Sequence, residues 1–171
     1  MNKDNTKVTF KGSPVTLLGT PVKVGDKAPD FTLLDATLSP KSLKDFEGKV
    51  KVMAIYPSID TGVCAAQNRK FNEMATKLSG DVVVLSVSCD LPFAQSRFCA
   101  AEGLNNVVTL SDHKTAEFGT RYGFLIEELR LLARGTVIVD KNNVVKFVEF
   151  VPEIATEPDY EASLQVIHQL V

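Results

Sequence analysis

The sequence predicts an α/β fold: a central mixed sheet flanked by helices, with a β-hairpin at the N-terminus. Three observations lead to this prediction. Strand-like and helix-like segments alternate through the middle of the chain, β-rich pairs separated by turn residues lie at both ends, and one long apolar run has the length of a strand. Because 44% of the 171 residues are hydrophobic and 23% are charged, the chain can bury one sizeable core, and we expect a single domain over residues 1–171.

The first quarter of the chain is expected to be extended. Residues 8–10 and 15–18 are rich in β-forming types and flank a short segment that contains Gly12, which predicts a hairpin that turns at this glycine. Three prolines between residues 21 and 40 argue against a helix there, because proline removes a backbone donor and restricts the residue before it.

The middle of the chain predicts a strand, a helix and a second strand. Residues 50–56 are β-rich and stop at Pro57, and residues 64–78 carry apolar or small side chains at helical spacing. Residues 81–88 contain the continuous apolar run, which is typical of a strand covered on both faces. Helices are therefore expected on each side of the sheet.

The second half continues the alternation. Residues 92–101 fit a helix with proline in its first turn, and residues 105–110 form a short β-rich segment. Residues 136–140 and 144–151 flank a turn and predict a hairpin, and residues 159–170 read as a closing amphipathic helix.

Composition argues against several kinds of partner. The net charge of -2 and the absence of a basic run predict no nucleic acid and no membrane partner. The polar residues 1–7, with no long apolar run after them, predict neither a secretory signal nor a membrane span, so a cytoplasmic location is expected. Three cysteines is an odd number, which favours redox or catalytic use over a static disulfide framework.

Cys64 lies where the predicted strand runs into the predicted helix. The first turn of a helix has unpaired N–H groups and a positive dipole end, so an anionic sulfur is favoured there. A helix terminus contributes at most about 2 kcal/mol, so a cation or further donors must add to it. Arg69 is a poor candidate because five residues along a helix is about 140° around its axis, and spacing alone does not rank the other arginines. Thr61 is suited to cap the helix, and its hydroxyl to donate to the sulfur or to a peroxide oxygen.

These residues resemble the active-site signature of the peroxiredoxins: proline, three residues, threonine, two residues, cysteine. Pro57, Thr61 and Cys64 match it. Residues 90–99, which end in Cys99, look like the resolving-cysteine segment of the thiol peroxidase subfamily, the atypical two-cysteine peroxiredoxins. The resemblance extends over nearly the whole chain through two further segments, residues 28–31 and residues 157–162.

The resemblance implies a thioredoxin-like fold and a peroxidase. It implies that Cys64 attacks hydrogen peroxide and alkyl hydroperoxides, that Cys99 resolves the resulting sulfenic acid as an intramolecular disulfide, and that thioredoxin reduces this disulfide. It further implies a homodimer. No cofactor is expected. Because Cys99 lies on a separate predicted helix, 35 positions after Cys64, some unwinding is expected when the disulfide forms.

The resemblance also implies which residue supplies the cation next to Cys64. Arg134 matches the arginine that in this family holds the thiolate and polarises the peroxide, and Pro57 would shape the pocket and exclude water. Gly135 departs from the bulkier residue expected after this arginine, which leaves the packing of the local strand open.

Each of these residues also has a purely structural interpretation. Cys64 and Cys99 would be small buried hydrophobes, Thr61 only a helix cap, and Arg134 a solvated surface charge. Cys89, at the end of the apolar run, is assigned no catalytic role.

Other functions are less well supported by the sequence. The cysteines form no C-x-x-C pair, so no metal site is expected, and no glycine-rich phosphate loop is present. Two alternatives stay open: a redox sensor that uses the same disulfide, and a cysteine hydrolase that pairs Cys64 with His113. Many turnovers with a thiol reductant are expected only of a peroxidase.

Overall fold

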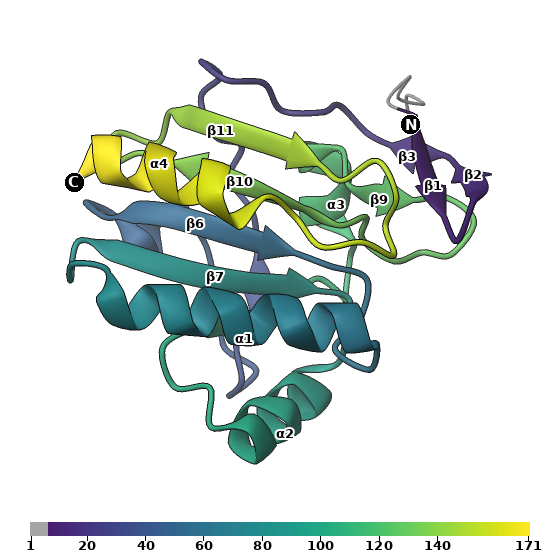
Figure 1. Cartoon of the computed structure of the whole chain (residues 1–171), viewed down its shortest axis with the longest axis horizontal. Helices are drawn as coiled ribbons and strands as arrows, with labels where there is room; N and C mark the ends of the chain where they lie inside the picture. Colours follow the sequence, from purple (N-terminus) through teal and green to yellow (C-terminus); the bar gives the residue numbers. More distant parts are fainter. Residues whose placement is uncertain (1–6) are drawn as a thin grey trace.

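The computed structural model describes residues 7–171, so residues 1–6 of the polar N-terminal segment lie outside the described part. Figure 1 shows a central sheet with helices against it. In chain order the elements are β1 (Val8–Phe10), β2 (Ser13–Val15), β3 (Leu17–Leu18), β4 (Leu33–Leu34), β5 (Pro40–Lys41), the 3-10 helix η1 (Leu43–Phe46), β6 (Val50–Ile55), α1 (Gly62–Lys77), β7 (Val82–Ser88), α2 (Pro92–Glu102), β8 (Val108–Ser111), α3 (Glu117–Tyr122), β9 (Leu125–Ile126), β10 (Gly135–Val139), β11 (Val145–Phe150) and α4 (Tyr160–Leu170).

The main sheet has seven strands in the order β11-β10-β6-β7-β8-β4-β5. Strands β6, β7 and β8 are parallel, and β10, β11, β4 and β5 join antiparallel. The predicted mixed sheet flanked by helices is therefore confirmed. The arrowheads of β6 and β7 lie at the same end of the sheet, next to the start of α1 (Figure 1).

Strand β6 explains why the sheet is covered on both faces. Its alternate residues Val50, Val52 and Ala54 pack with α1 and α4 through side chains such as Phe71 and Ile167. Met53 and Ile55 belong to a larger core on the opposite face, which contains α3 and the extended N-terminal segment. Strand β7 is apolar on both sides for the same reason.

The N-terminal hairpin is shorter than predicted. Strands β1 and β2 pair antiparallel as expected, but Leu17 and Leu18 leave the hairpin and pair with β9 instead. Both leucines are buried, so this pairing carries apolar side chains into the core that the hairpin would have left at the surface. The expected strand over residues 105–110 also begins later, at Val108.

Close packing around position 135 explains why a glycine follows Arg134. A Cβ added at Gly135 would lie 2.1 Å from the Glu149 carbonyl oxygen and 2.6 Å from a ring carbon of Phe124. The Phe124 ring stacks on Phe150 at 4.1 Å between centroids, so it cannot move away without losing that contact. Strand packing at this position requires a glycine.

No helix within residues 7–171 combines the length and the apolar character that a membrane crossing requires.

Candidate active site

The loop between β6 and α1 presents Cys64 at the start of a helix. Thr61 is the N-cap residue, with extended backbone angles, and its Oγ1 accepts a hydrogen bond from the Cys64 N–H at 3.3 Å. The Thr61 hydroxyl donates to the Ser58 carbonyl oxygen at 3.4 Å. A hydroxyl has one proton to donate, so in this state it does not donate to the sulfur. Pro57 is buried beside the loop.

The sulfur of Cys64 is fully buried and faces a guanidinium. Arg134, at the start of β10, is only 2% exposed, and its Nη2 donates to Cys64 Sγ at 3.1 Å. A surface role for Arg134 is therefore wrong. Cys64 is buried as a small hydrophobe would be, but its sulfur accepts a hydrogen bond from a buried guanidinium, a contact that a purely apolar site would not provide.

Two acceptors hold the guanidinium in this direction. Arg134 Nε donates to the Ile154 carbonyl oxygen at 2.7 Å, and Nη1 donates to Gln67 Oε1 at 2.5 Å. Gln67 is itself anchored, because its Nε2 donates to the Ile55 carbonyl oxygen at 3.3 Å. Gln67 was not predicted as a site residue from the sequence. A polar residue one turn after Cys64, on the inward face of α1, was the available signal.

A second buried network lies beneath the helix start. Asn68 Nδ2 donates to the Cys64 carbonyl oxygen at 2.9 Å, and Asn68 Oδ1 accepts from Ser86 Oγ at 2.5 Å. The Tyr56 hydroxyl shares a 2.8 Å hydrogen bond with the same serine, and burial raises the Tyr56 pKa above its ordinary range. These polar groups fix the first turn of α1 against β6 and β7.

Cys99 lies on α2 but borders a different hollow. Phe98 and Ala94 of α2 pack against the cluster that contains Cys64. Cys99 follows Phe98 and therefore lies about 100° from it around the helix axis. It lines a hollow with Leu104 and Thr109, and burial raises the pKa of its thiol. All three cysteines are free thiols. For Cys99 to reach Cys64, the C-terminal half of α2 has to rotate or unwind.

Cys89 and His113 lie together, away from this arrangement. Both line a hollow at the end of β7 and β8. Burial, with a smaller effect of Asp112 and Asp90, raises the Cys89 pKa to about 12, so this thiol is a poor nucleophile at neutral pH.

The cysteine hydrolase alternative needs His113 beside Cys64. The side chain that contacts the Cys64 sulfur is Arg134, which cannot act as a general base.

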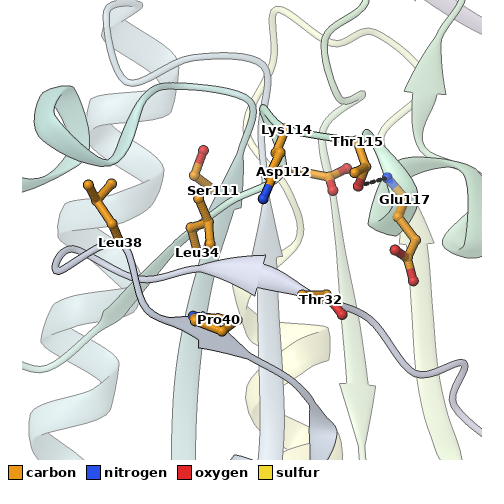
Figure 2. A pocket seen from close by; sticks show the side chains of 9 residues that line it. All are labelled: Thr32, Leu34, Leu38, Pro40, Ser111, Asp112, Lys114, Thr115 and Glu117. Atoms are coloured by element: carbon orange, nitrogen blue, oxygen red, sulfur yellow. Dashed lines mark hydrogen bonds between the residues drawn. The ribbon is translucent and has the colours of Figure 1, made fainter.

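Figure 2 shows another hollow, between β4, β8 and the start of α3. Asp112 lines it and is buried, and its two carboxylate oxygens accept from the N–H groups of Phe118 at 3.1 Å and Gly119 at 2.8 Å. Burial raises the Asp112 pKa to about 6, although these hydrogen bonds act in the opposite direction. Asp112 therefore anchors α3, a helix that was not predicted from the sequence. No cysteine borders this hollow.

The Asp112 carboxyl predicts a pH-dependent stability. Its pKa is about 6 in the folded chain and near 3.8 in an unfolded one, so the folded state binds this proton more tightly. The stability it contributes is present below about pH 4 and is lost as the pH rises through 6, by roughly 3 kcal/mol at most. Urea unfolding between pH 4 and 7 measures this loss. The Asp112→Asn variant should flatten the profile, and an unchanged profile would assign it to another group.

Comparison with known proteins finds close relatives over most of the chain. The model of the redoxin family matches residues 23–164. The chain is 55% identical over 164 residues to a thiol peroxidase of Oceanobacillus iheyensis, which covers 96% of this chain and 99% of the relative. It is 53% identical to a thiol peroxidase of Bacillus subtilis, with 96% and 98% covered. Among solved structures, a peroxiredoxin-like protein from Aquifex aeolicus superposes with a TM-score of 0.91 at 37% identity, over 100% of both chains.

Proposed function

Because the chain belongs to the redoxin family and is a thiol peroxidase of the peroxiredoxin type, we propose that Cys64 is its peroxidatic residue and Cys99 its resolving residue. The observation that carries this proposal is the 3.1 Å hydrogen bond from Arg134 Nη2 to a sulfur in the first turn of α1. A buried guanidinium stabilises the thiolate form, which is the nucleophile.

The first step oxidises Cys64 and reduces the peroxide. The thiolate attacks one oxygen of ROOH, the S–O bond forms as the O–O bond breaks, and the leaving RO⁻ takes up a proton to become ROH. The sulfur is left as a sulfenic acid. Arg134 is aimed at the sulfur and would also donate to the oxygen on which negative charge develops. Thr61 would donate to the peroxide after its hydroxyl turns from Ser58, and buried Pro57 would keep water from the pocket.

The second step protects the oxidised sulfur. The Cys99 thiol attacks the sulfenic sulfur, an S–S bond forms and water leaves, which prevents further oxidation of Cys64. The Cys99 carbonyl oxygen accepts hydrogen bonds from the N–H groups of Gly103 and Leu104. These hydrogen bonds close the C-terminal end of α2, and they would be released when this half of the helix unwinds.

A dithiol reductant completes the cycle by exchanging its thiols for the disulfide. On the family resemblance this reductant is thioredoxin, and the substrates are hydrogen peroxide and alkyl hydroperoxides. The proposal includes a reducing compartment such as the cytoplasm, where thiols persist, and a homodimer. Sedimentation of the full chain tests the dimer.

Steady-state consumption of hydroperoxides with thioredoxin and its reductase tests the function. A peroxidase consumes many equivalents of peroxide, and comparison of hydrogen peroxide with bulkier alkyl hydroperoxides reveals the preferred substrate. A redox sensor would stop after about one equivalent. Absence of sustained turnover with any thiol reductant would refute the proposal.

The Cys99→Ser variant is expected to complete one turnover with thioredoxin and then stall. Its Cys64 sulfenic acid has no partner thiol, and further peroxide takes it to sulfinic acid. Mass spectrometry after one equivalent of peroxide measures this: the native chain should give a Cys64–Cys99 crosslink within one chain, and the variant a sulfenic acid. Equal steady-state rates for the two proteins, or a dominant crosslink between chains, would remove Cys99 from the proposed role.

A further inference from the structure

Asp90 connects the loop before Cys64 to the end of strand β7. Its Oδ1 accepts from Ser58 Oγ at 2.7 Å, and its Oδ2 accepts from the Ile59 N–H at 2.9 Å. The same Oδ2 accepts from Ser88 Oγ at 2.6 Å. Three donors from two separate segments of the chain thus meet on one carboxylate. The contact with Ser88 is local, but the two with Ser58 and Ile59 join Asp90 to a segment about 30 residues earlier in the chain.

Hydrogen bonds within the loop also meet at Ser58. Ser58 organises the loop internally: its Oγ accepts from the Asp60 N–H at 3.1 Å, and its carbonyl oxygen accepts from the Thr61 N–H at 3.3 Å. Asp90 therefore binds the residue around which the loop turns. Thr61, whose side chain caps the helix at Cys64, donates to the Ser58 carbonyl oxygen through both its N–H and its hydroxyl.

The same carboxylate is linked to the helix that carries Cys99. Ser88 Oγ accepts a hydrogen bond from Gln95 Nε2 at 3.0 Å, and the same Nε2 donates to the Leu110 carbonyl oxygen at 3.0 Å. Gln95 is fully buried. The first turn of α2 is thereby anchored to the sheet, whereas Ser96, Arg97 and residues 100–103 are exposed.

We propose that Asp90 is a positioning residue for peroxide reduction: it holds residues 58–61 in the conformation in which Cys64 and Arg134 meet the substrate. Through Ser88 and Gln95 it also fixes the start of α2, so that unwinding during disulfide formation is confined to the part of the helix after Gln95. This inference rests on the proposed peroxidase function. Asp90 acts through the loop and does not contact the sulfur.

Two substitutions separate the hydrogen bonds from the charge. In Asp90→Asn the amide oxygen can still accept from Ile59 and Ser88, and the amide nitrogen can donate to Ser58 Oγ, because a hydroxyl also accepts. Asp90→Ala removes all three hydrogen bonds and frees the loop. Asp140→Ala is a matched control: its carboxylate accepts from the N–H groups of Asn142 and Val144 in the β10–β11 turn, at the opposite end of the sheet.

Two measurements on the full-length reduced protein test the proposal. The first is the second-order rate constant for oxidation of Cys64 by hydrogen peroxide, obtained by competition with a reference peroxidase in a Cys99→Ser background. We expect Asp90→Ala to lower it about 10-fold, and Asp90→Asn and Asp140→Ala to change it less than about 2-fold. The second is amide hydrogen exchange of residues 58–61, expected to accelerate in Asp90→Ala alone. With Cys99 present, disulfide closure in Asp90→Ala should be as fast as in the native chain, or faster.

Unchanged exchange of residues 58–61 in Asp90→Ala, or faster exchange with a native oxidation rate, would overturn the proposal. An equal loss of rate in Asp140→Ala would also overturn it, because the effect would then be general destabilisation. If the native protein itself fails to consume peroxide, the proposed function fails, while the exchange measurement still decides whether Asp90 holds the loop.

Discussion

Replacing Cys64 by serine is expected to abolish peroxide consumption. A serine hydroxyl is not ionised at neutral pH, even beside a guanidinium, and oxygen does not form a sulfenic acid, so both the nucleophile and the intermediate are lost. We expect turnover to fall by about 10³-fold or more, to the uncatalysed rate. Steady-state peroxide consumption with a thiol reductant measures the loss.

The control for this variant is Cys89→Ser, which removes the thiol with the strongly raised pKa. It should retain native turnover, because Cys89 does not border the Cys64 cluster. Activity above about 1% of the native rate in Cys64→Ser would move the reaction to another residue. Circular dichroism of both variants excludes a loss of folding as the cause.

Replacing Arg134 by methionine is expected to lower kcat/KM for hydroperoxide by about 10²–10³-fold. The substitution keeps much of the side-chain volume but removes the donor 3.1 Å from the Cys64 sulfur and leaves Gln67 Oε1 without its partner. Arg134→Lys should recover part of the loss, because an ammonium supplies charge but lacks the planar fork that reaches three acceptors together.

Arg69→Met serves as the matched control. Arg69 lies on α1 only five residues after Cys64, but its guanidinium points to solvent and pairs with Glu102 at 3.0 Å. Its removal should leave kcat/KM within about twofold of native, as expected for an exposed ion pair. An equal effect of the two arginine variants would mean that general electrostatics, not the contact with the sulfur, governs the reaction.

Local sequence patterns predicted the central elements well. The strand–helix–strand unit formed by β6, α1 and β7 was predicted with boundaries close to those observed. The two strands are β-rich or continuously apolar, the helix has apolar residues at helical spacing, Pro57 marks the end of the first strand and Thr61 the start of the helix. The short strands β4, β5 and β9 were missed, and β3 was predicted as part of the N-terminal hairpin although it pairs with β9. Two-residue strands carry no periodicity, and their pairing depends on distant partners.

The site was predictable only in part, because some of its residues act through contacts with distant parts of the chain. The motif from Pro57 to Cys64 is continuous in sequence and could be read directly. Arg134 was singled out by family resemblance alone, since nothing in its local sequence distinguishes it from the other arginines. Gln67 and Asp90 were missed because their roles come from hydrogen bonds to residues on other elements, over separations of up to 67 positions.

The 70 positions that separate Cys64 from Arg134 have a consequence for biosynthesis. In a chain emerging from the ribosome, Cys64 is translated 70 residues before the arginine that contacts its sulfur in the folded chain. Until β10 inserts beside β6, the nascent chain has an ordinary cysteine, with no cation fixed against it. On the proposed role of Cys64, the contact that favours its thiolate therefore forms only when β10 completes the sheet.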